Sequence, residues 1–376
     1  MDTLLAIHLR AAQIPDSVHK LKFLRSELEE SDVLAAPPVR RIPFPTVVAM
    51  VIAALAFLFT RATVNPEHAK AGEALSLPAA VSIAPVEGKI EKIWLVEKRP
   101  AYWVYSNGLQ IRTEYLTEST VRHYVTWSRE DLVENAAEAA MPAGIVFHTT
   151  ESLMLPLEAG EAHSLVRTRE AMLEHIRRGR LYNYVIDRFG QVFRVVPDDE
   201  VAFHAGHSVW ADARTVYEGL NESFLGVALE ARTDGSLVQD PAQIRSGRML
   251  TDLLRGEYSI PGENCVTHAQ VSVNPRNMQI GYHTDWAANF PFGEFGLPDG
   301  YASAPASIEL FGFDYNRHFL EAIGGKPWQG LLTAEATVRR AAEARKCSTA
   351  EYRELLRRKY QAIRSQRNEP ADRDRT

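Results

Sequence analysis

The stretch CVTHAQVSVNPRNMQIGYHTDW, residues 265–286, places two histidines and an aspartate near the end of a segment of globular composition. Far upstream, the strand-like run GIVFHTT, residues 144–150, carries another histidine. Imidazole and carboxylate are ligands that zinc takes, and a catalytic zinc keeps three protein ligands and leaves a fourth position for water. His148, His268 and Asp285 are therefore predicted to form a zinc site.

Length and composition limit the classes of function. The chain has 376 residues, 45% of them hydrophobic, and a formal net charge of −6. The charges are spread without long blocks of one sign, so we expect no nucleic-acid partner. The two cysteines, Cys265 and Cys347, can form one disulfide at most, and the sequence does not say whether they meet. A metal site must therefore rely mainly on histidine and carboxylate.

An uncharged run, IPFPTVVAMVIAALAFLFT, occupies residues 42–60. As a helix it would measure about 28 Å, close to the hydrocarbon thickness of a bilayer. A buried core helix is the alternative, but the run is apolar on every face and lies outside the segment with the histidines. We therefore predict a transmembrane anchor over residues 42–62, after an N-terminal segment of residues 1–41.

The basic residues around this run predict its orientation. Several lie shortly before it and fewer follow it closely: Lys20, Lys22, Arg25, Arg40 and Arg41 against Arg61 and Lys70. The excess of positive charge places residues 1–41 in the cytoplasm and the chain after about residue 62 across the membrane. A cleaved signal peptide is the alternative, but the segment before the run is too long for an ordinary one. We favour an uncleaved single-pass anchor.

From Ala143 onward the pattern alternates between strands and helices. Strands are predicted at 144–148 and 224–231, a hairpin at 182–187 and 191–196, and helices at 164–178 and 241–258. The pattern predicts an α/β domain with a mixed central β-sheet flanked by helices, over residues 143–300.

The flanks of this domain are less regular. Residues 63–142 read as a linker followed by a small accessory region with short strands at 88–127, either a separate module or an extension packed on the main domain. Residues 301–376 read as a C-terminal helical extension, with helical patterns at 304–323, 333–345 and 349–365 and a disordered, charged tail.

Five blocks of this sequence carry a resemblance to a known family. They are GIVFHTT, YNYVIDRFGQVFRVVPDDEVAFHAGHS, NESFLGVALEA, VTHAQVS and HTDW, in that order. Together they resemble the zinc-dependent N-acetylmuramoyl-L-alanine amidases, the family that also contains phage amidase-lysozymes and peptidoglycan recognition proteins. The resemblance covers roughly residues 143–291. It implies a mixed sheet with flanking helices, a Zn²⁺ ion in a groove, and cleavage of the amide between N-acetylmuramic acid and L-alanine in peptidoglycan.

The resemblance also assigns residues. His148, His268 and Asp285 match the three zinc ligands, the same three that the residue types predict. Zinc would polarise the amide carbonyl and lower the pKa of its bound water. In the family's blocks, His204 matches a residue near the groove, which we interpret as a substrate-contacting or groove-shaping residue, with a structural histidine as the alternative.

Three positions near the site depart from the family or remain open. Many members carry a general-base glutamate in a central strand where this chain has Ala228, and Glu230 shares its predicted strand face and could take the role. Phage-type members use a tyrosine instead, which matches Tyr182 as a proton-handling or substrate-orienting phenol. A lysine common in the family is replaced by His283, whose imidazolium could stabilise an oxyanion; His283 is also the alternative ligand to Asp285. The alternative for Glu230 is a surface or paired strand carboxylate, and for Tyr182 a core tyrosine.

The spacing between the second and third ligands is wider than we expect for the family. We therefore predict an insertion in the loop 272–282. The combined prediction is a membrane-anchored amidase, with its catalytic domain on the periplasmic side of a bacterial inner membrane and peptidoglycan or muropeptides as partners. A protein that binds muropeptides without cutting them is the alternative, and a structural envelope protein is a third possibility.

Overall fold

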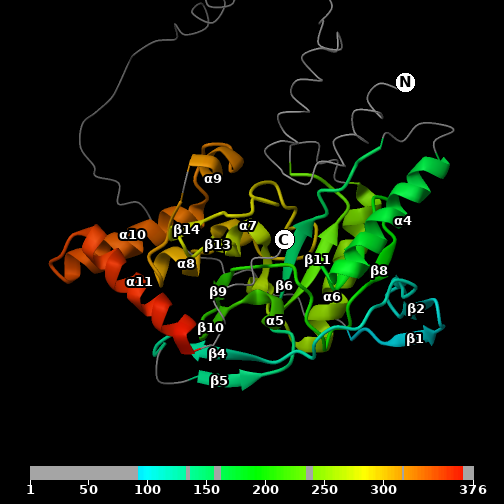
Figure 1. Cartoon of the computed structure of the whole chain (residues 1–376), viewed down its shortest axis with the longest axis horizontal. Coiled ribbons are helices and arrows are strands. Elements are labelled where there is room, and N and C mark those ends of the chain that lie inside the picture. The colour runs from blue at the N-terminus through cyan, green and yellow to red at the C-terminus, as the bar shows by residue number, and fades with distance from the viewer. Residues whose placement is uncertain (1–91, 133–135, 156–161, 234–239, 316, 367–376) are drawn as a thin grey trace, which may run out of the picture. The chain divides into compact units, whose positions relative to one another are not determined.

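A sheet of eight strands, in the order β1-β2-β3-β8-β7-β11-β6-β12, forms the centre of the fold. The computed structural model describes residues 92–132, 136–155, 162–233, 240–315 and 317–366 (Figure 1). The strands are β1 (Leu95–Lys98), β2 (Tyr102–Tyr105), β3 (Gln110–Arg112), β6 (Gly144–Thr149), β7 (Tyr184–Ile186), β8 (Val192–Arg194), β11 (Phe224–Leu229) and β12 (Cys265–Thr267). All described residues belong to one compact unit, Ile83–Thr376.

Strands β6 and β11 form the parallel middle of this sheet. They pair from Gly144 with Phe224 to Thr149 with Leu229, and every residue of both strands is buried. Parallel strands that are covered on both faces carry near-continuous apolar runs, as GIVF and FLGVAL do. The other edge of β6 pairs in parallel with β12, so the carboxyl ends of the three strands lie along the same side of the sheet.

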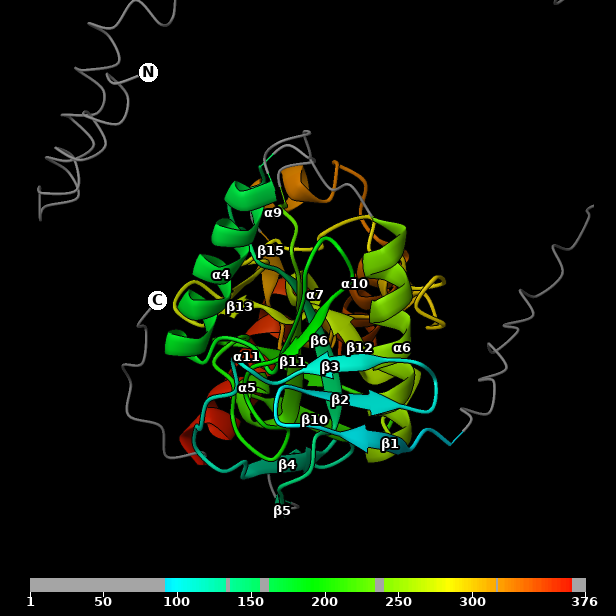
Figure 2. The ribbon, with the colours of Figure 1, turned by 90° about the vertical axis from the view of Figure 1, so that its right-hand side faces the viewer.

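One long helix covers each face of the sheet. Helix α4 (Ala162–Gly179) buries Leu173 and Ile176 against a cluster that includes Val185 of β7. Helix α6 (Pro241–Tyr258) lies on the opposite side from α4 (Figure 2), and its leucines pack in one cluster with residues of β6 and β11. Asp240 caps α6 by accepting a hydrogen bond from the Ala242 N–H, and Pro241 occupies the first turn, where proline is well tolerated. The predicted helices, strands and β7–β8 hairpin are confirmed.

The structure decides between the two predictions for residues 88–127. Strands β1, β2 and β3 form an antiparallel meander whose last strand pairs in parallel with β8. This region therefore extends the main sheet. The next strand, β4 (Tyr124–Ser128), belongs to a second, antiparallel sheet in the order β5-β4-β10-β9, with β5 (Ala136–Ala139), β9 (Val209–Ala211) and β10 (Thr215–Glu218).

The C-terminal residues share a core with the second sheet. They form α8 (Ala306–Glu309), α9 (Arg317–Ala322), α10 (Gln329–Ala344) and α11 (Thr349–Gln366). Trp127 and Val216 of the second sheet lie in one apolar cluster with Phe311, Trp328 and Ile363 of this C-terminal part. These helices are therefore packed into the domain rather than appended to it. Short elements complete the fold: α5 (Leu220–Ser223), α7 (His268–Val271) and the 3₁₀ turns Gly262–Asn264 and Gly300–Ala302.

The helical pattern predicted at 304–323 is interrupted in the structure. Between α8 and α9 the chain turns at Gly312, with φ of 66°, and forms β15 (Asp314–Tyr315). This strand pairs in parallel with β14 (Gln279–Ile280), which pairs with β13 (Val273–Asn274). The predicted insertion at 272–282 thus contains a short hairpin that the C-terminal part completes into a sheet.

Two further predictions concern the membrane and the cysteines. The predicted anchor, residues 42–62, and the flanking segments 1–41 and 63–91 lie outside the described residues. Among the helices that the structure does describe, none combines the length and the apolar character that a membrane crossing needs. Cys265 and Cys347 are both free thiols and do not pair with each other.

Candidate metal centre

Strand register brings the two predicted histidine ligands to the same place. β12 pairs with β6 so that Thr267 lies level with Phe147, and the next residue on each strand is a histidine, His268 or His148. His268 begins α7, and Thr267 and Gln270 form a capping box there, in which the Gln270 side chain accepts from the Thr267 N–H at 2.8 Å. Both imidazoles are thus fixed by backbone structure on adjacent strands.

Asp285 follows the 272–282 loop by three residues and lies beside these histidines. Its carbonyl accepts a hydrogen bond from the Ala269 N–H at 3.2 Å, which ties the third residue to the first turn of α7. The next residue, Trp286, has a φ of 57°, a left-handed conformation that few non-glycine residues adopt. Tyr301 donates its hydroxyl proton to the Trp286 carbonyl at 2.7 Å and holds this turn.

The three side chains form a tight, buried cluster. The Asp285 carboxylate lies 3.1 Å from Nδ1 of His148 through one oxygen and 2.9 Å from Nδ1 of His268 through the other. One ligand atom from each residue lies within 4.8 Å of the other two, and all three residues are buried. The sequence prediction that these residues meet is confirmed, and together they could hold a metal ion.

Electrostatics favour the protonation states that metal ligands need. Burial, with His268 next, lowers the pKa of His148 to about 4. Burial alone would raise the pKa of Asp285, but His268 and the hydrogen bonds from both histidines outweigh it and hold the pKa well below its usual range. A neutral imidazole beside an ionised carboxylate is the form in which these groups bind a cation.

The cluster fits zinc. Imidazole nitrogen and carboxylate oxygen are ligands that zinc takes, and one such atom from each of the three residues lies within 4.8 Å of the other two. Nε2 of His268 is buried and has no hydrogen-bond partner in the described part of the chain. The donor set of two imidazoles and one carboxylate leaves room for a fourth ligand.

His204 lies behind His148 and is buried. Its Nδ1 is 3.0 Å from Nε2 of His148, the ring nitrogen that faces away from Asp285. The Asn221 side chain accepts hydrogen bonds from the His204 and Ala205 N–H groups, at 2.8 and 2.6 Å, and fixes this loop. A partner on the far nitrogen orients a ligating imidazole. His204 is thus placed to orient a ligand, which is close to our alternative of a structural histidine, and the substrate contact or groove-shaping role stays a prediction.

A glycine makes the approach of His204 possible. A Cβ atom at Gly226 of β11 would lie 2.6 Å from the His204 ring, which no real packing allows. Burial, with His148 next, lowers the pKa of His204 well below its usual value, so its ring is neutral near neutral pH.

Tyr182 lies beside His148. Its ring centroid is 5.1 Å from that of His148, and its hydroxyl donates to the Thr149 carbonyl at 3.5 Å. Burial, with Asp285 and Glu151 next, raises the pKa of the phenol far above its usual value. The phenol therefore stays protonated and is a hydrogen-bond donor, which agrees with a proton-handling role that stays a prediction.

His283 stacks on a ligand. Its ring is 4.7 Å from that of His268, with the planes 19° apart. Burial, with His268 next, lowers the pKa of His283 to about 4, so the imidazolium that we expected to stabilise an oxyanion is absent near neutral pH. The ligand group contains Asp285 and not His283, in agreement with our preferred assignment.

Glu230 is held by an arginine. Its carboxylate accepts hydrogen bonds from Nε of Arg188 at 3.2 Å and from the Arg188 N–H at 3.1 Å, and both side chains are buried. Ala228, not Glu230, lies level with His148 in the β6–β11 register. The structure therefore gives Glu230 a place in an ion pair, our alternative for it, and its catalytic role stays a prediction.

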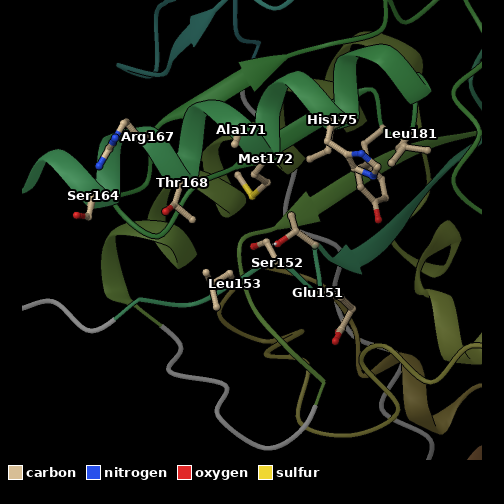
Figure 3. Close-up of a pocket in the computed structure, with 13 residues that line it drawn as sticks. Glu151, Ser152, Leu153, Ser164, Arg167, Thr168, Ala171, Met172, His175 and Leu181 are labelled. Carbon is tan, nitrogen blue, oxygen red and sulfur yellow. Dashed lines mark hydrogen bonds between the residues drawn. The ribbon is translucent and has the colours of Figure 1, made fainter. Parts of the chain in front are cut away.

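A pocket of about 730 Å³ opens beside Tyr182. In Figure 3, α4 forms one wall with residues from Ser164 to His175, and the segment after β6 forms the other with Glu151, Ser152 and Leu153. Glu151 has a φ of 49° and its carboxylate accepts from the Thr149 hydroxyl at 2.5 Å and the Thr233 N–H at 2.8 Å. We did not single out this glutamate from the sequence, although its place three residues after His148 was a signal.

Comparisons with known proteins agree with this site. Residues 138–285 match the family model of the N-acetylmuramoyl-L-alanine amidases. None of the curated proteins matches the chain.

Several solved structures are similar to part of the chain. LysC, an N-acetylmuramoyl-L-alanine amidase from Clostridium intestinale URNW, shares 22% identity over 41% of this chain and 82% of its own, with a TM-score of 0.26. AmiD from E. coli, in complex with anhydro-N-acetylmuramic acid-L-Ala-D-gamma-Glu-L-Lys, shares 23% identity over 43% and 60%, with a TM-score of 0.31. AmpDh3 from Pseudomonas aeruginosa, in complex with anhydromuramic pentapeptide, shares 20% identity over 49% and 72%, with a TM-score of 0.31.

At these low TM-scores the structural likenesses add no argument of their own, so the assignment rests on the family match and on the site. The matched segment contains all three residues of the buried cluster, His148, His268 and Asp285. Residues 138–285 therefore belong to the N-acetylmuramoyl-L-alanine amidase family of hydrolases, which act on peptidoglycan.

Proposed function

We propose that this chain is a zinc-dependent amidase that hydrolyses the bond between N-acetylmuramic acid and L-alanine of peptidoglycan stem peptides. The buried cluster of His148, His268 and Asp285, inside the segment that matches the family, carries this proposal. The three residues would hold the ion. Bound zinc would supply a Lewis acid for the amide carbonyl and lower the pKa of a water molecule at its open position.

The neighbouring side chains supply positions and protons. His204 holds His148 through its far nitrogen, which fixes the tautomer and the direction of Nδ1. The protonated Tyr182 phenol can donate a hydrogen bond to the substrate amide, and it stands between His148 and the pocket. A buried donor with a fixed direction stabilises developing charge at little reorganisation cost.

The pocket beside Tyr182 suits the peptide half of the substrate. Hydroxyls of Thr150, Ser152 and Thr168 line it, and Glu151 and Arg167 add one charge of each sign. A stem peptide offers amide groups, carboxylates and an amine, which these groups can pair with. This pocket therefore supports a peptidoglycan fragment as the ligand.

One observation favours a second function, the binding of muropeptides without cleavage. Ala228 occupies the position level with His148 where many family members carry a glutamate, and Glu230 is paired with Arg188. Without a carboxylate base, hydrolysis would depend on the metal centre and Tyr182. The intact group of three ligand residues favours catalysis, because a site that only binds peptide does not need it.

We further propose that the enzyme works on the periplasmic side of a bacterial inner membrane. The apolar run 42–60 and the excess of basic residues before it support a single-pass anchor with the amidase domain across the membrane. The substrate class supports the same side, since peptidoglycan lies outside this membrane. Labelling with a membrane-impermeant reagent would test this topology, with one cysteine introduced after residue 62 in a chain whose Cys265 and Cys347 are replaced by serine.

The test of the function joins metal content with turnover in the full-length, detergent-solubilised chain. We expect one zinc per chain and release of free stem peptide from purified peptidoglycan, and a chelator should abolish the release. His148→Ala or His268→Ala should lose both zinc and release, whereas His123→Ala, at an exposed histidine outside the site, should keep both. Bound zinc without release would favour the binding protein, and absence of zinc would refute the ligand assignment.

A further inference from the structure

Five aromatic rings form a continuous row through the metal centre. The centroids follow one another at 5.1 Å from Tyr182 to His148, 4.5 Å to His268, 4.7 Å to His283 and 4.8 Å to Tyr282. The two ligating histidines occupy the middle, and a tyrosine stands at each end. The two tyrosines are therefore the two ends of this series of ring contacts, and their surroundings can be compared.

The two ends differ in exposure and chemistry. Tyr182 lines the pocket that Glu151 and Arg167 make polar and charged. Tyr282, by contrast, is 60% exposed, and the plane of its ring is nearly perpendicular, at 85°, to the plane of the His283 ring. An exposed aromatic ring beside a catalytic centre offers a flat apolar surface for a ligand.

The backbone fixes Tyr282 in place. The preceding Gly281 has a φ of 68°, and a Cβ there would lie 2.2 Å from the Phe319 ring of α9. The following His283 donates its N–H to the Ser272 hydroxyl at 3.0 Å. The hairpin of β13 and β14 ends directly before Gly281, so the exposed ring is held by ordered structure on both sides.

The substrate of the proposed amidase also has two unlike halves. On one side of the scissile amide lies a peptide with charged groups, and on the other a pyranose ring whose C–H faces are apolar. Sugar C–H faces pack on flat aromatic rings, whereas charged peptide groups need ionic and hydrogen-bonding partners. The pocket at the Tyr182 end matches the peptide, which leaves the Tyr282 end for the sugar.

We infer that Tyr282 is the platform on which the N-acetylmuramyl ring stacks, and that it selects substrates that carry this sugar. The inference rests on the amidase function proposed above. It assigns a role in substrate choice to the inserted loop 272–282, and it sets the direction of the substrate across the metal centre.

The test compares two substrates that share the scissile amide. N-acetylmuramyl-L-alanyl-D-isoglutamine carries the sugar, and D-lactoyl-L-alanyl-D-isoglutamine lacks it. In the full-length, zinc-loaded protein, Tyr282→Ala should raise KM for the muramyl substrate by roughly fivefold to tenfold, the scale of one lost stacking contact. It should leave kcat, zinc content and KM for the lactoyl substrate close to those of the unchanged protein, and Tyr282→Phe should restore the low KM.

Trp94→Ala is the matched control, because Trp94, directly before the edge strand β1, is 59% exposed and takes no part in the row of rings. It should change neither KM. An equal rise in KM for both substrates, or no rise for either, would overturn the role of Tyr282.

A binding measurement distinguishes the failure of this inference from the failure of the proposed function. If the unchanged protein cleaves neither substrate, the amidase proposal fails, but saturation-transfer NMR with the muramyl dipeptide still decides the platform. Transfer to the sugar protons that disappears in Tyr282→Ala supports the platform, and equal transfer in both proteins refutes it.

Discussion

The central sheet and the C-terminal helices are both well buried, but they are built in different ways. Between β6, β11 and β12 the core side chains, aliphatic and aromatic, lie on or against strands whose backbones pair directly. In the C-terminal part the core side chains, among them Phe311, Phe313, Phe319, Trp328 and Tyr360, join separate short elements that share few backbone pairings. The first region is held by repetitive backbone bonds and the second by particular side chains, so they should respond differently to substitution.

The two regions meet at the segment that carries two of the metal ligands. Cys265 and Trp286 pack in the core of the sheet, whereas Ala269 and Ala287 pack in the C-terminal cluster. Trp328 donates its indole N–H to the Ala287 carbonyl at 2.9 Å. The C-terminal helices are therefore part of the support of the metal centre, although residues 301–366 lie outside the matched segment.

The largest effect is expected from removing the C-terminal helices. Truncation after Ser303 would expose the second sheet and the underside of the ligand segment, and the lost burial would exceed the whole stability of a typical domain, about 5–15 kcal/mol. We expect no cooperative thermal transition and no bound zinc. Truncation after Gln366, the last residue of α11, should keep both. A folded, zinc-binding protein without residues 304–376 would show that the helices are an appendage.

Single core substitutions should separate stability from metal binding. Phe319→Ala removes the ring that packs on Gly281, four residues before Asp285, and should cost about 3–5 kcal/mol. Leu250→Ala on α6, in the core of the sheet, should cost about 2–5 kcal/mol. Only Phe319→Ala should also weaken zinc binding, measured by titration against a competing chelator. Equal zinc affinity in both variants would mean that α9 does not support the ligand loop.

The sequence predicted the first region better than the second. A local hydrophobic periodicity predicts each element of this region: strands β6 and β11, the hairpin, and helices α4 and α6. Pro241 marks the first residue of α6. The three ligands followed from residue type and family blocks. The C-terminal packing did not, because residues such as Trp127 and Ile363 belong to one core only through contacts between distant segments.

Within the site, side-chain partners were the hardest part to predict. Strand alternation placed Glu230 on the face of Ala228, but the ion pair with Arg188 from the β7–β8 turn is a contact that no local pattern reveals. In the same way, His204 was recognised as near the groove, but its bond to His148 depends on the absence of a side chain at Gly226.

Replacing one arginine in each region tests the same contrast between the sheet and the C-terminal part, with smaller expected losses of stability. Arg188→Met leaves the Glu230 carboxylate buried without its partner and should cost about 3–5 kcal/mol. Arg357→Met breaks a contact to Asp314, whose side chain is half exposed, and should cost about 1 kcal/mol or less. Urea unfolding of both variants measures the difference. Comparable losses would show that the C-terminal ion pairs matter as much as the buried pair of the sheet.

The last prediction concerns the pH dependence of the free energy of unfolding, which should come from the buried histidines around the metal centre. Burial lowers the pKa values of His148 and His204 in the folded protein, so folding disfavours their protonation. The unfolded chain takes up these protons below about pH 6.5. Stability of the metal-free protein is therefore full above that pH and falls as the pH drops, by about 1.4 kcal/mol per pH unit for each histidine. Burial lowers the pKa of His283 as well, so three histidines contribute to the slope. His204→Gln should therefore lower the slope between pH 6.5 and 5 by about a third, measured by urea unfolding, whereas His123→Gln at an exposed position should keep it. Losing the contact between His204 and His148 lowers stability at every pH, so the slopes of stability against pH are compared rather than the stabilities themselves. An unchanged slope in His204→Gln would mean that this histidine is not held neutral behind the metal centre.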